Sequence, residues 1–330
     1  MKKSLWAGAL VMALGALPGI VFAQADEAQK EVDKQVAKAI TDAINARVTT
    51  QVATEAATAT TPNNLWVSAG QISIEQQGAF GFDMSIPALL GGWDRDVRGK
   101  ALTGVSFAYY RFDETLNPGG GGQSGIDIES NSFSVSPYFA FLLSPNYFIT
   151  TKLNLGFSVS EADFSSTSSS GGTTTTVTSQ SDIFTFNYGL GGAFNALYRP
   201  GNFVLKGAAR VDWSAYSTTT DTTSTTRTTG GGFNFTGFSS SSTSDSDSST
   251  SYGFDAEVGF VIGSRSYLFA TYQWTDSTES DSDAQTFMNV GFEQKFGRAA
   301  ALGIKYGTNV GGKDTDPDVQ TIFLTFRMGF

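Results

Sequence analysis

The feature that most constrains the fold is an alternation of apolar and polar residues with a period of two, repeated across residues 65–330. This is the period of a β-strand, in which successive side chains point to opposite faces. Several of the alternating segments are longer than the usual five or six residues and reach the roughly 9–11 residues that a tilted strand needs to cross a bilayer. In the final segment the apolar face comprises Ile322, Leu324, Phe326, Met328 and Phe330.

The connections between these segments alternate between short and long, which is typical of outer-membrane barrels with tight periplasmic turns and longer external loops. The pattern therefore predicts an all-β fold, a closed antiparallel transmembrane β-barrel of about 12 strands over residues 62–330. The Ser/Thr-rich tracts 164–181 and 217–250 are predicted to be mobile surface loops, because they hold too little apolar area to fold alone. The predicted strands lie near 65–75, 82–95, 100–113, 127–143, 147–163, 182–199, 202–216, 251–263, 266–276, 285–297, 299–310 and 318–330. The first three of these alternate poorly, so their limits are less well defined.

In at least eight predicted strands the apolar face carries no charge over nearly its whole length, and the charged residues in mid-strand lie on the opposite face. A secreted β-sandwich would place that face in open water, whereas a barrel encloses it. Aromatic residues gather near strand ends, as the interfacial girdles of a barrel require; among them are Tyr109, Tyr110, Tyr138, Tyr147, Trp213 and Trp274. The candidate pore-lining residues are Lys152, Lys206, Arg210, Asp212, Asp255, Glu257, Glu293, Lys295, Lys305 and Arg327. We expect the four acids among them to pair with Lys206, Arg210, Lys295 and Lys305 in a network inside the lumen.

The N-terminus has the three parts of an export signal: a basic start, an apolar core and small residues before a cleavage site. Residues 1–23 are therefore predicted to be a signal peptide, cleaved between Ala23 and Gln24. No second apolar run of about 20 residues follows, which excludes a helical membrane protein.

Residues 24–61 contain no Gly or Pro and predict a helix. An apolar residue recurs every fourth position, so the apolar stripe winds around the helix axis instead of staying on one face. Such a helix suits contacts from several sides. Two hypotheses remain open: the poorly charged half, about 48–60, plugs the pore, or the segment is a periplasmic coiled-coil spacer. The stripe comprises Val32, Val36, Ile40, Ile44, Val48 and Val52.

Composition excludes several function classes. The chain has no Cys and no His, which removes thiol nucleophiles, Ser-His-Asp hydrolases and most zinc sites. The net charge of −10 argues against a nucleic-acid partner. The acidic run 276–283 and the Asp-x-Asp-x-Asp at 314–318 lack the Gly and Glu of a calcium loop. We therefore expect no enzyme activity, no catalytic or metal-binding residues and no cofactor.

The segment 88–94, Ala-Leu-Leu-Gly-Gly-Trp-Asp, followed by the alternating run 102–109, resembles the second hairpin of the translocator (β-) domain of classical autotransporters. The predicted helix and the terminal run 325–330, Thr-Phe-Arg-Met-Gly-Phe, extend the resemblance. It implies a twelve-stranded outer-membrane barrel with a helix through its pore, and it implies that Phe330 is a signal for the barrel-assembly machinery. The long passenger of that family is not evident between the signal and the helix.

The resulting expectation is an integral barrel in the outer membrane of a Gram-negative bacterium, with its long loops extracellular and both sheet ends periplasmic. Its pore would be occupied or flanked by the N-terminal helix. A narrow diffusion porin for small polar or charged solutes and a structural or adhesive surface barrel remain alternatives. Expected partners are outer-membrane lipid and lipopolysaccharide, the Sec translocon, the barrel-assembly machinery, and small solutes or a translocated segment.

Overall fold

The computed structural model describes Val36 and residues 63–76, 82–97, 100–116, 124–170, 172–230, 233–263, 265–278, 284–297, 300–310 and 318–330. The predicted signal peptide 1–23, with its cleavage site, lies outside these residues, as does the segment 24–61 apart from Val36. Across the described residues, no helix is both long and apolar enough to cross a membrane.

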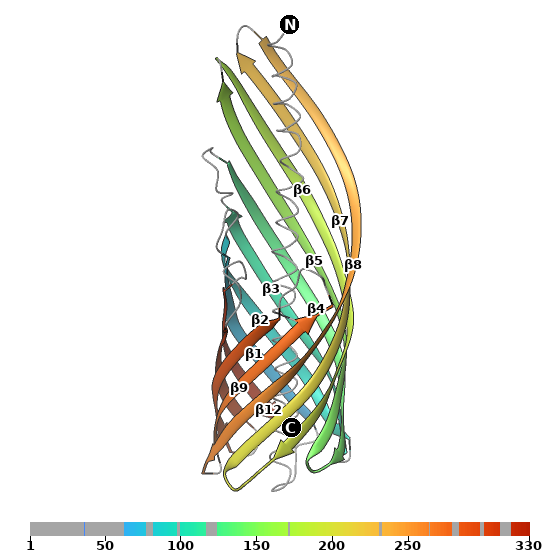
Figure 1. Cartoon of the computed structure of the whole chain (residues 1–330), viewed down its shortest axis with the longest axis vertical. Coiled ribbons are helices and arrows are strands. Elements are labelled where there is room, and N and C mark those ends of the chain that lie inside the picture. Colours follow the sequence, from blue (N-terminus) through green and yellow to red (C-terminus); the bar gives the residue numbers. More distant parts are fainter. Residues whose placement is uncertain are drawn as a thin grey trace.

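The period-two segments form twelve strands that pair antiparallel with their sequence neighbours, and β1 also pairs with β12 (Figure 1). This confirms the predicted closed barrel of 12 strands. The strands are β1 Asn63–Gln76, β2 Phe82–Val97, β3 Ala101–Leu116, β4 Ser124–Ser144, β5 Tyr147–Ser170, β6 Thr173–Tyr198, β7 Phe203–Gly230, β8 Phe233–Ile262, β9 Ser266–Ser277, β10 Gln285–Phe296, β11 Ala300–Asn309 and β12 Asp318–Gly329.

The two ends of the sheet meet at one seam. β1 and β12 pair over their whole lengths, from Asn64 opposite Gly329 to Glu75 opposite Asp318. Beyond the strand ends, the Asn63 N–H donates to the Phe330 carbonyl at 3.3 Å and the Phe330 N–H donates to the Asn63 carbonyl at 3.0 Å. The seam leaves neither terminal strand with an open edge, as a sheet in hydrocarbon requires.

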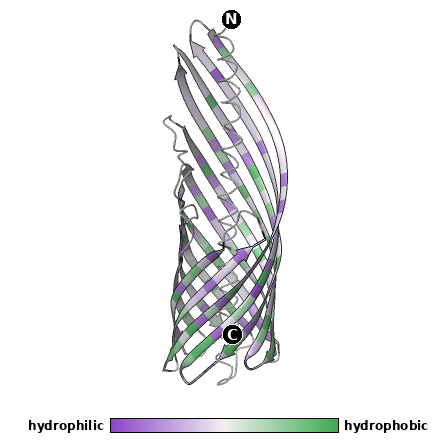
Figure 2. Cartoon of the chain, viewed as in Figure 1, coloured by the Kyte–Doolittle hydropathy of each residue, from purple (hydrophilic) through white to green (hydrophobic). Residues whose placement is uncertain are grey.

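Large apolar side chains cover the outside of the closed part of the barrel. On β6, for example, every second residue from Phe184 to Tyr198 faces outward, and Leu190 at the middle of this run is 60% exposed. Figure 2 shows the apolar colouring concentrated in this closed part. Such a band matches the lipid-facing surface of an outer-membrane-type barrel.

A row of acidic residues marks one limit of the apolar band. Asp113, Glu129, Glu161, Asp182 and Asp221 lie directly opposite one another on β3 to β7, and all five are exposed on the outer face. Like charges in direct cross-strand register repel. Arg111 neutralises Glu129 with an ion pair of 2.7 Å, and water must screen the other carboxylates, so this row lies outside the hydrocarbon.

The prediction that residues 164–181 and 217–250 are surface loops is wrong. These tracts continue β5, β6, β7 and β8 beyond the acidic row as regular antiparallel strands. The four strands rise from the barrel as a tall extension, and β8 forms one lateral edge of it (Figure 1). At a strand's usual rise, the 30 residues of β8 span about 100 Å.

The Ser/Thr tracts form strands because they continue the strand pairing and register that the barrel strands already have. The pairing of β6 with β7 runs without a shift from Tyr198 opposite Leu205 to Thr173 opposite Gly230. Thr favours strands, and hydroxyl groups pair across them: Ser179 with Ser224 and Ser181 with Thr222, both at 2.6 Å. Isolated tracts would lack this template, so low apolar content alone was a poor guide.

The lipid-facing assignment can be tested at Leu190. We expect Leu190→Arg to destabilise the barrel by about 2–4 kcal/mol, because it places a charge near the middle of the hydrocarbon. The measurement is reversible unfolding of the full chain in lipid vesicles. Leu190→Ala is the matched control and should have a much smaller effect. Equal stability of the arginine and alanine variants would contradict a lipid-facing position.

Candidate functional site

The candidate site is the interior of the closed barrel. All ten charged residues expected to line a pore lie on the face opposite the exposed apolar band, and all are buried or half-buried. Because the sheet is closed, that face encloses the lumen. They come from β5, β7, β8, β10, β11 and β12, so the charged wall occupies one part of the circumference.

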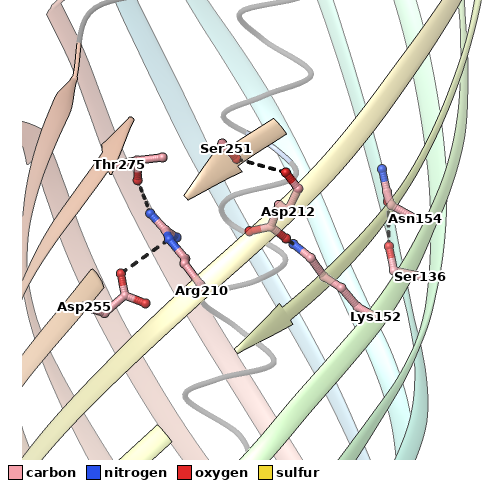
Figure 3. A network of polar contacts seen from close by, with 8 residues as sticks. All are labelled: Ser136, Lys152, Asn154, Arg210, Asp212, Ser251, Asp255 and Thr275. Carbon is pink, nitrogen blue, oxygen red and sulfur yellow. Dashed lines mark hydrogen bonds and ion pairs between the residues drawn. The ribbon is translucent and has the colours of Figure 1, made fainter. Parts of the chain in front are cut away.

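One ion pair crosses an intervening strand. The Lys152 ammonium on β5 lies 3.0 Å from the Asp212 carboxylate on β7 (Figure 3). Both residues are level with Gly191 of β6, which lies between them. A Cβ at Gly191 would overlap Asp212 Oδ1 and the Lys152 side chain, so only glycine leaves room for this pair.

Arg210 on β7 joins two further strands. Its Nε is 3.7 Å from Asp255 Oδ1 on β8, an ion pair too long for a hydrogen bond, and its guanidinium also donates to the Thr275 hydroxyl on β9 (Figure 3). On the Asp212 side, the Ser251 hydroxyl donates to the Asp212 carbonyl at 3.5 Å. The ion pairs therefore tie β5, β7 and β8 together along the interior wall.

The other acids have partners on nearby strands. Glu293 forms an ion pair with Arg327, and Glu257 accepts a hydrogen bond from the Tyr267 hydroxyl at 2.6 Å. The sequence led us to expect pairs among the acids and Lys206, Arg210, Lys295 and Lys305. Of the ion pairs described here, Arg210–Asp255 fits that set. Asp212 and Glu293 instead pair with Lys152 and Arg327, residues on the candidate list that were not assigned to them.

Sequence reasoning missed several interior polar residues. Asp94 is fully buried and accepts hydrogen bonds from Asn64 Nδ2 and the Tyr138 hydroxyl, each at 3.1 Å. Asn289 donates to the Thr271 hydroxyl at 2.9 Å. Asn289 carries no charge, and Asp94 lies in a segment that alternates poorly, so the sequence pattern does not mark either residue.

Part of the interior of the first four strands is apolar, which explains the poor alternation of the first three. Ile72, Ile74, Met84 and Ile86 are 0% exposed although they face inward, on the side opposite the outer band. Two predicted girdle residues, Tyr110 and Tyr138, are also interior: they are buried within this cluster, so their assignment to an interfacial girdle was wrong. The lumen thus has an apolar cluster centred on β1 to β4, with Asp94 and several buried serines beside it, and ion pairs on the later strands. We call these two parts the apolar wall and the charged wall.

Ion pairs and hydrogen bonds join charged residues of the interior. Among the described residues, no group of three or more acidic side chains is placed to hold a metal ion. The acids of the charged wall are paired with cations or a tyrosine, as in a structural network. The closed sheet, apolar outer band and polar interior wall define the class: an outer-membrane-type β-barrel.

Solved structures of the same kind include the translocator domain of the autotransporter NalP from Neisseria meningitidis. It matches with 12% identity and a TM-score of 0.60, over 89% of this chain and 98% of that one. The β domain of the Bordetella autotransporter BrkA matches with 18% identity and a TM-score of 0.55, over 82% of this chain and all of that one. The chain is a 12-stranded barrel that resembles autotransporter translocator domains, which confirms the expected resemblance in fold.

No protein-family model matches the sequence, and no curated protein matches it. The resemblance is therefore one of architecture. Both matched structures are described as translocator or β domains and not as enzymes.

The role of Gly191 is testable against its neighbour. We expect Gly191→Ala to destabilise the barrel by about 1–3 kcal/mol, because the new methyl group must push apart Lys152 and Asp212. Gly192→Ala is the control: its Cβ would meet only the Thr150 carbonyl, at 3.5 Å. Unfolding in detergent micelles measures both. A Gly191→Ala variant as stable as Gly192→Ala would show that the Lys152–Asp212 pair does not depend on this glycine.

Proposed function

We propose that this chain is an outer-membrane pore protein of the autotransporter-translocator kind, whose lumen holds its own N-terminal segment, residues 24–61. The single observation that carries this proposal is the burial of the apolar wall. Ile72, Ile74, Met84 and Ile86 face the lumen yet are 0% exposed. Val36, from the N-terminal segment, is 2% exposed and belongs to the same apolar cluster.

The width of the barrel means that burial of these side chains indicates another segment inside the lumen. Eight strands enclose an interior that the wall's own side chains can just fill, and twelve strands enclose a wider one. Aliphatic side chains on the wall of the wider lumen stay exposed unless another segment covers them. Val36 has a helical backbone conformation. Both facts support a helix that lies against β1 to β4.

The pattern of the N-terminal segment complements the two walls. Its apolar stripe, which includes Val36, suits the cluster on β1 to β4, and its acidic and basic residues suit the charged wall. Val36 lies in the densely charged half of the predicted helix, ahead of Arg47. The proposed lumenal part therefore includes more than the stretch 48–60, which lies outside the described residues. This favours a plug over a periplasmic spacer.

The proposed orientation places the β5–β8 extension at the cell surface and the short turns in the periplasm, as in other barrels of this type. Export through the Sec translocon would follow from the signal 1–23, and insertion by the barrel-assembly machinery from the terminal strand with Phe330. Lipopolysaccharide would contact the apolar band below the acidic row. We propose no enzymatic role.

Conductance tests the plug. We expect deletion of residues 24–60 to raise the single-channel conductance of the purified barrel severalfold, because it opens the lumen. In the intact chain, Val36→Asp should cause frequent openings, because it places a carboxylate in the apolar cluster. Val36→Ile, which keeps that contact apolar, is the control. Unchanged conductance in both the deletion and Val36→Asp would overturn the plug and leave a diffusion porin or a spacer.

Labelling tests the orientation. The chain has no Cys, so a single introduced thiol reports one position. We expect a membrane-impermeant maleimide to label Ser240→Cys, in the extension, on intact cells. Asn202→Cys, in the short turn between β6 and β7, should react only after the outer membrane is permeabilised. The reverse result would place the extension in the periplasm.

A further inference from the structure

The β5–β8 extension has one long unpaired edge. β8 pairs with β7 along its whole length, but its pairing with β9 begins only at Ser251 opposite Ser277. Among the described residues, no strand therefore pairs with the outer edge of β8 over residues 233–249, which span about 55 Å. On the opposite side of the extension, β4 covers β5 up to Ser166, so only four residues of β5 extend further.

The even-numbered residues of β8 direct their backbone groups to this edge. The Thr250 carbonyl accepts a hydrogen bond from the Thr278 N–H at 2.9 Å, on the side of β9. The odd-numbered Val261 donates to Asn202, on the side of β7. The register of β8 with β7 is constant to the tip of the strand, so the same alternation holds there.

The part of this edge nearest the barrel is protected by side chains. The Ser246 N–H donates to Asp245 Oδ1 at 2.8 Å, and the Ser248 N–H donates to Asp247 Oδ1 at 2.7 Å. The Thr250 N–H donates to the Thr278 hydroxyl at 3.2 Å. We call residues 245–250 the lower edge. Its outward N–H groups are occupied, and its two carboxylates repel an approaching anion.

Residues 234–244, the upper edge, carry none of these protections. They contain no charged residue and no proline, the usual devices that keep edge strands apart. Phe235 and Phe238 are both exposed there, Phe238 at 81%, and they point to opposite faces of the sheet. The upper edge therefore offers an open ladder of backbone donors and acceptors with an apolar side chain on each face.

We propose that the upper edge pairs antiparallel with the upper edge of a second copy of this chain in a facing membrane. The charges select this arrangement. Two copies side by side in one membrane would pair in parallel, and the same register would set Asp245 and Asp247 against their counterparts, which is unfavourable. Antiparallel pairing joins the uncharged upper edges and moves the carboxylates to opposite ends of the contact.

This inference rests on the proposed orientation, since only an extension outside the cell can meet a facing membrane. The extension points away from the barrel, so a copy in an opposing membrane presents its β8 in the reverse direction (Figure 1). A single contact of about eleven residues per strand is weak. Many copies on two facing membranes act together, so the pairing would join membranes through multivalency.

Cysteine cross-linking tests the geometry with the full chain in lipid vesicles at low protein density. We expect Ser240→Cys, near the centre of the upper edge, to cross-link two copies on different vesicles. Ser248→Cys, on the lower edge, should not cross-link with itself, because antiparallel pairing separates the two thiols. Equally efficient cross-linking at Ser248→Cys would overturn the antiparallel arrangement. If maleimide labels the Ser240→Cys thiol from outside but the thiol does not cross-link, edge pairing itself is overturned and the proposed orientation stands.

A proline variant tests the backbone contact. Position 240 directs its N–H outward, so Ser240→Pro removes an edge donor while the bonds of β7 with odd-numbered residues remain. We expect this variant to reduce vesicle clustering, measured by light scattering, about tenfold, since the loss multiplies over many contacts. Ser240→Ala keeps the N–H and should cluster like the parent chain. Heat-modifiable gel migration verifies that both fold, and equal clustering by both would contradict the proposal.

Discussion

The structure depends first on the closure of one sheet. Hydrocarbon offers no hydrogen-bond partner, so every backbone N–H and C=O within it must pair inside the protein. The seam between β1 and β12 satisfies this requirement along its whole length, down to the two terminal contacts between Asn63 and Phe330. Closure then separates two environments, and the two-residue period of each strand assigns alternate side chains to lipid and to the interior.

The interior that closure creates is not uniform. Strands β1 to β4 line it with aliphatic and aromatic side chains, whereas the later strands line it with paired charges. A barrel of twelve strands encloses a wider interior than the eight-stranded kind that side chains alone can fill. The proposed plug suits this interior, because a segment with an apolar stripe and a charged remainder can contact both walls. The resemblance to translocator domains is consistent with it at the level of fold.

Beyond the apolar band the constraint of closure ends, because water can satisfy the backbone groups that lipid cannot. The sheet opens there into the four strands of the extension, and an open sheet must have edges. The barrel templates these strands, yet it also leaves β8 without a neighbour above Ser251. The opening of the sheet therefore creates both the extension and its long unpaired edge, which is the surface proposed to join two copies.

The sequence alone determined the strand number, the antiparallel order and the outward face of most strands, because a period of two is a local property of the chain. Only the tertiary structure decided which charges meet: Lys152 reaches Asp212 across β6, and the gap at Gly191 becomes visible only once the register is known. It also decided that the Ser/Thr tracts are strands and that Tyr138 faces inward. Register and neighbouring strands settle such questions, and neither is encoded within a single segment.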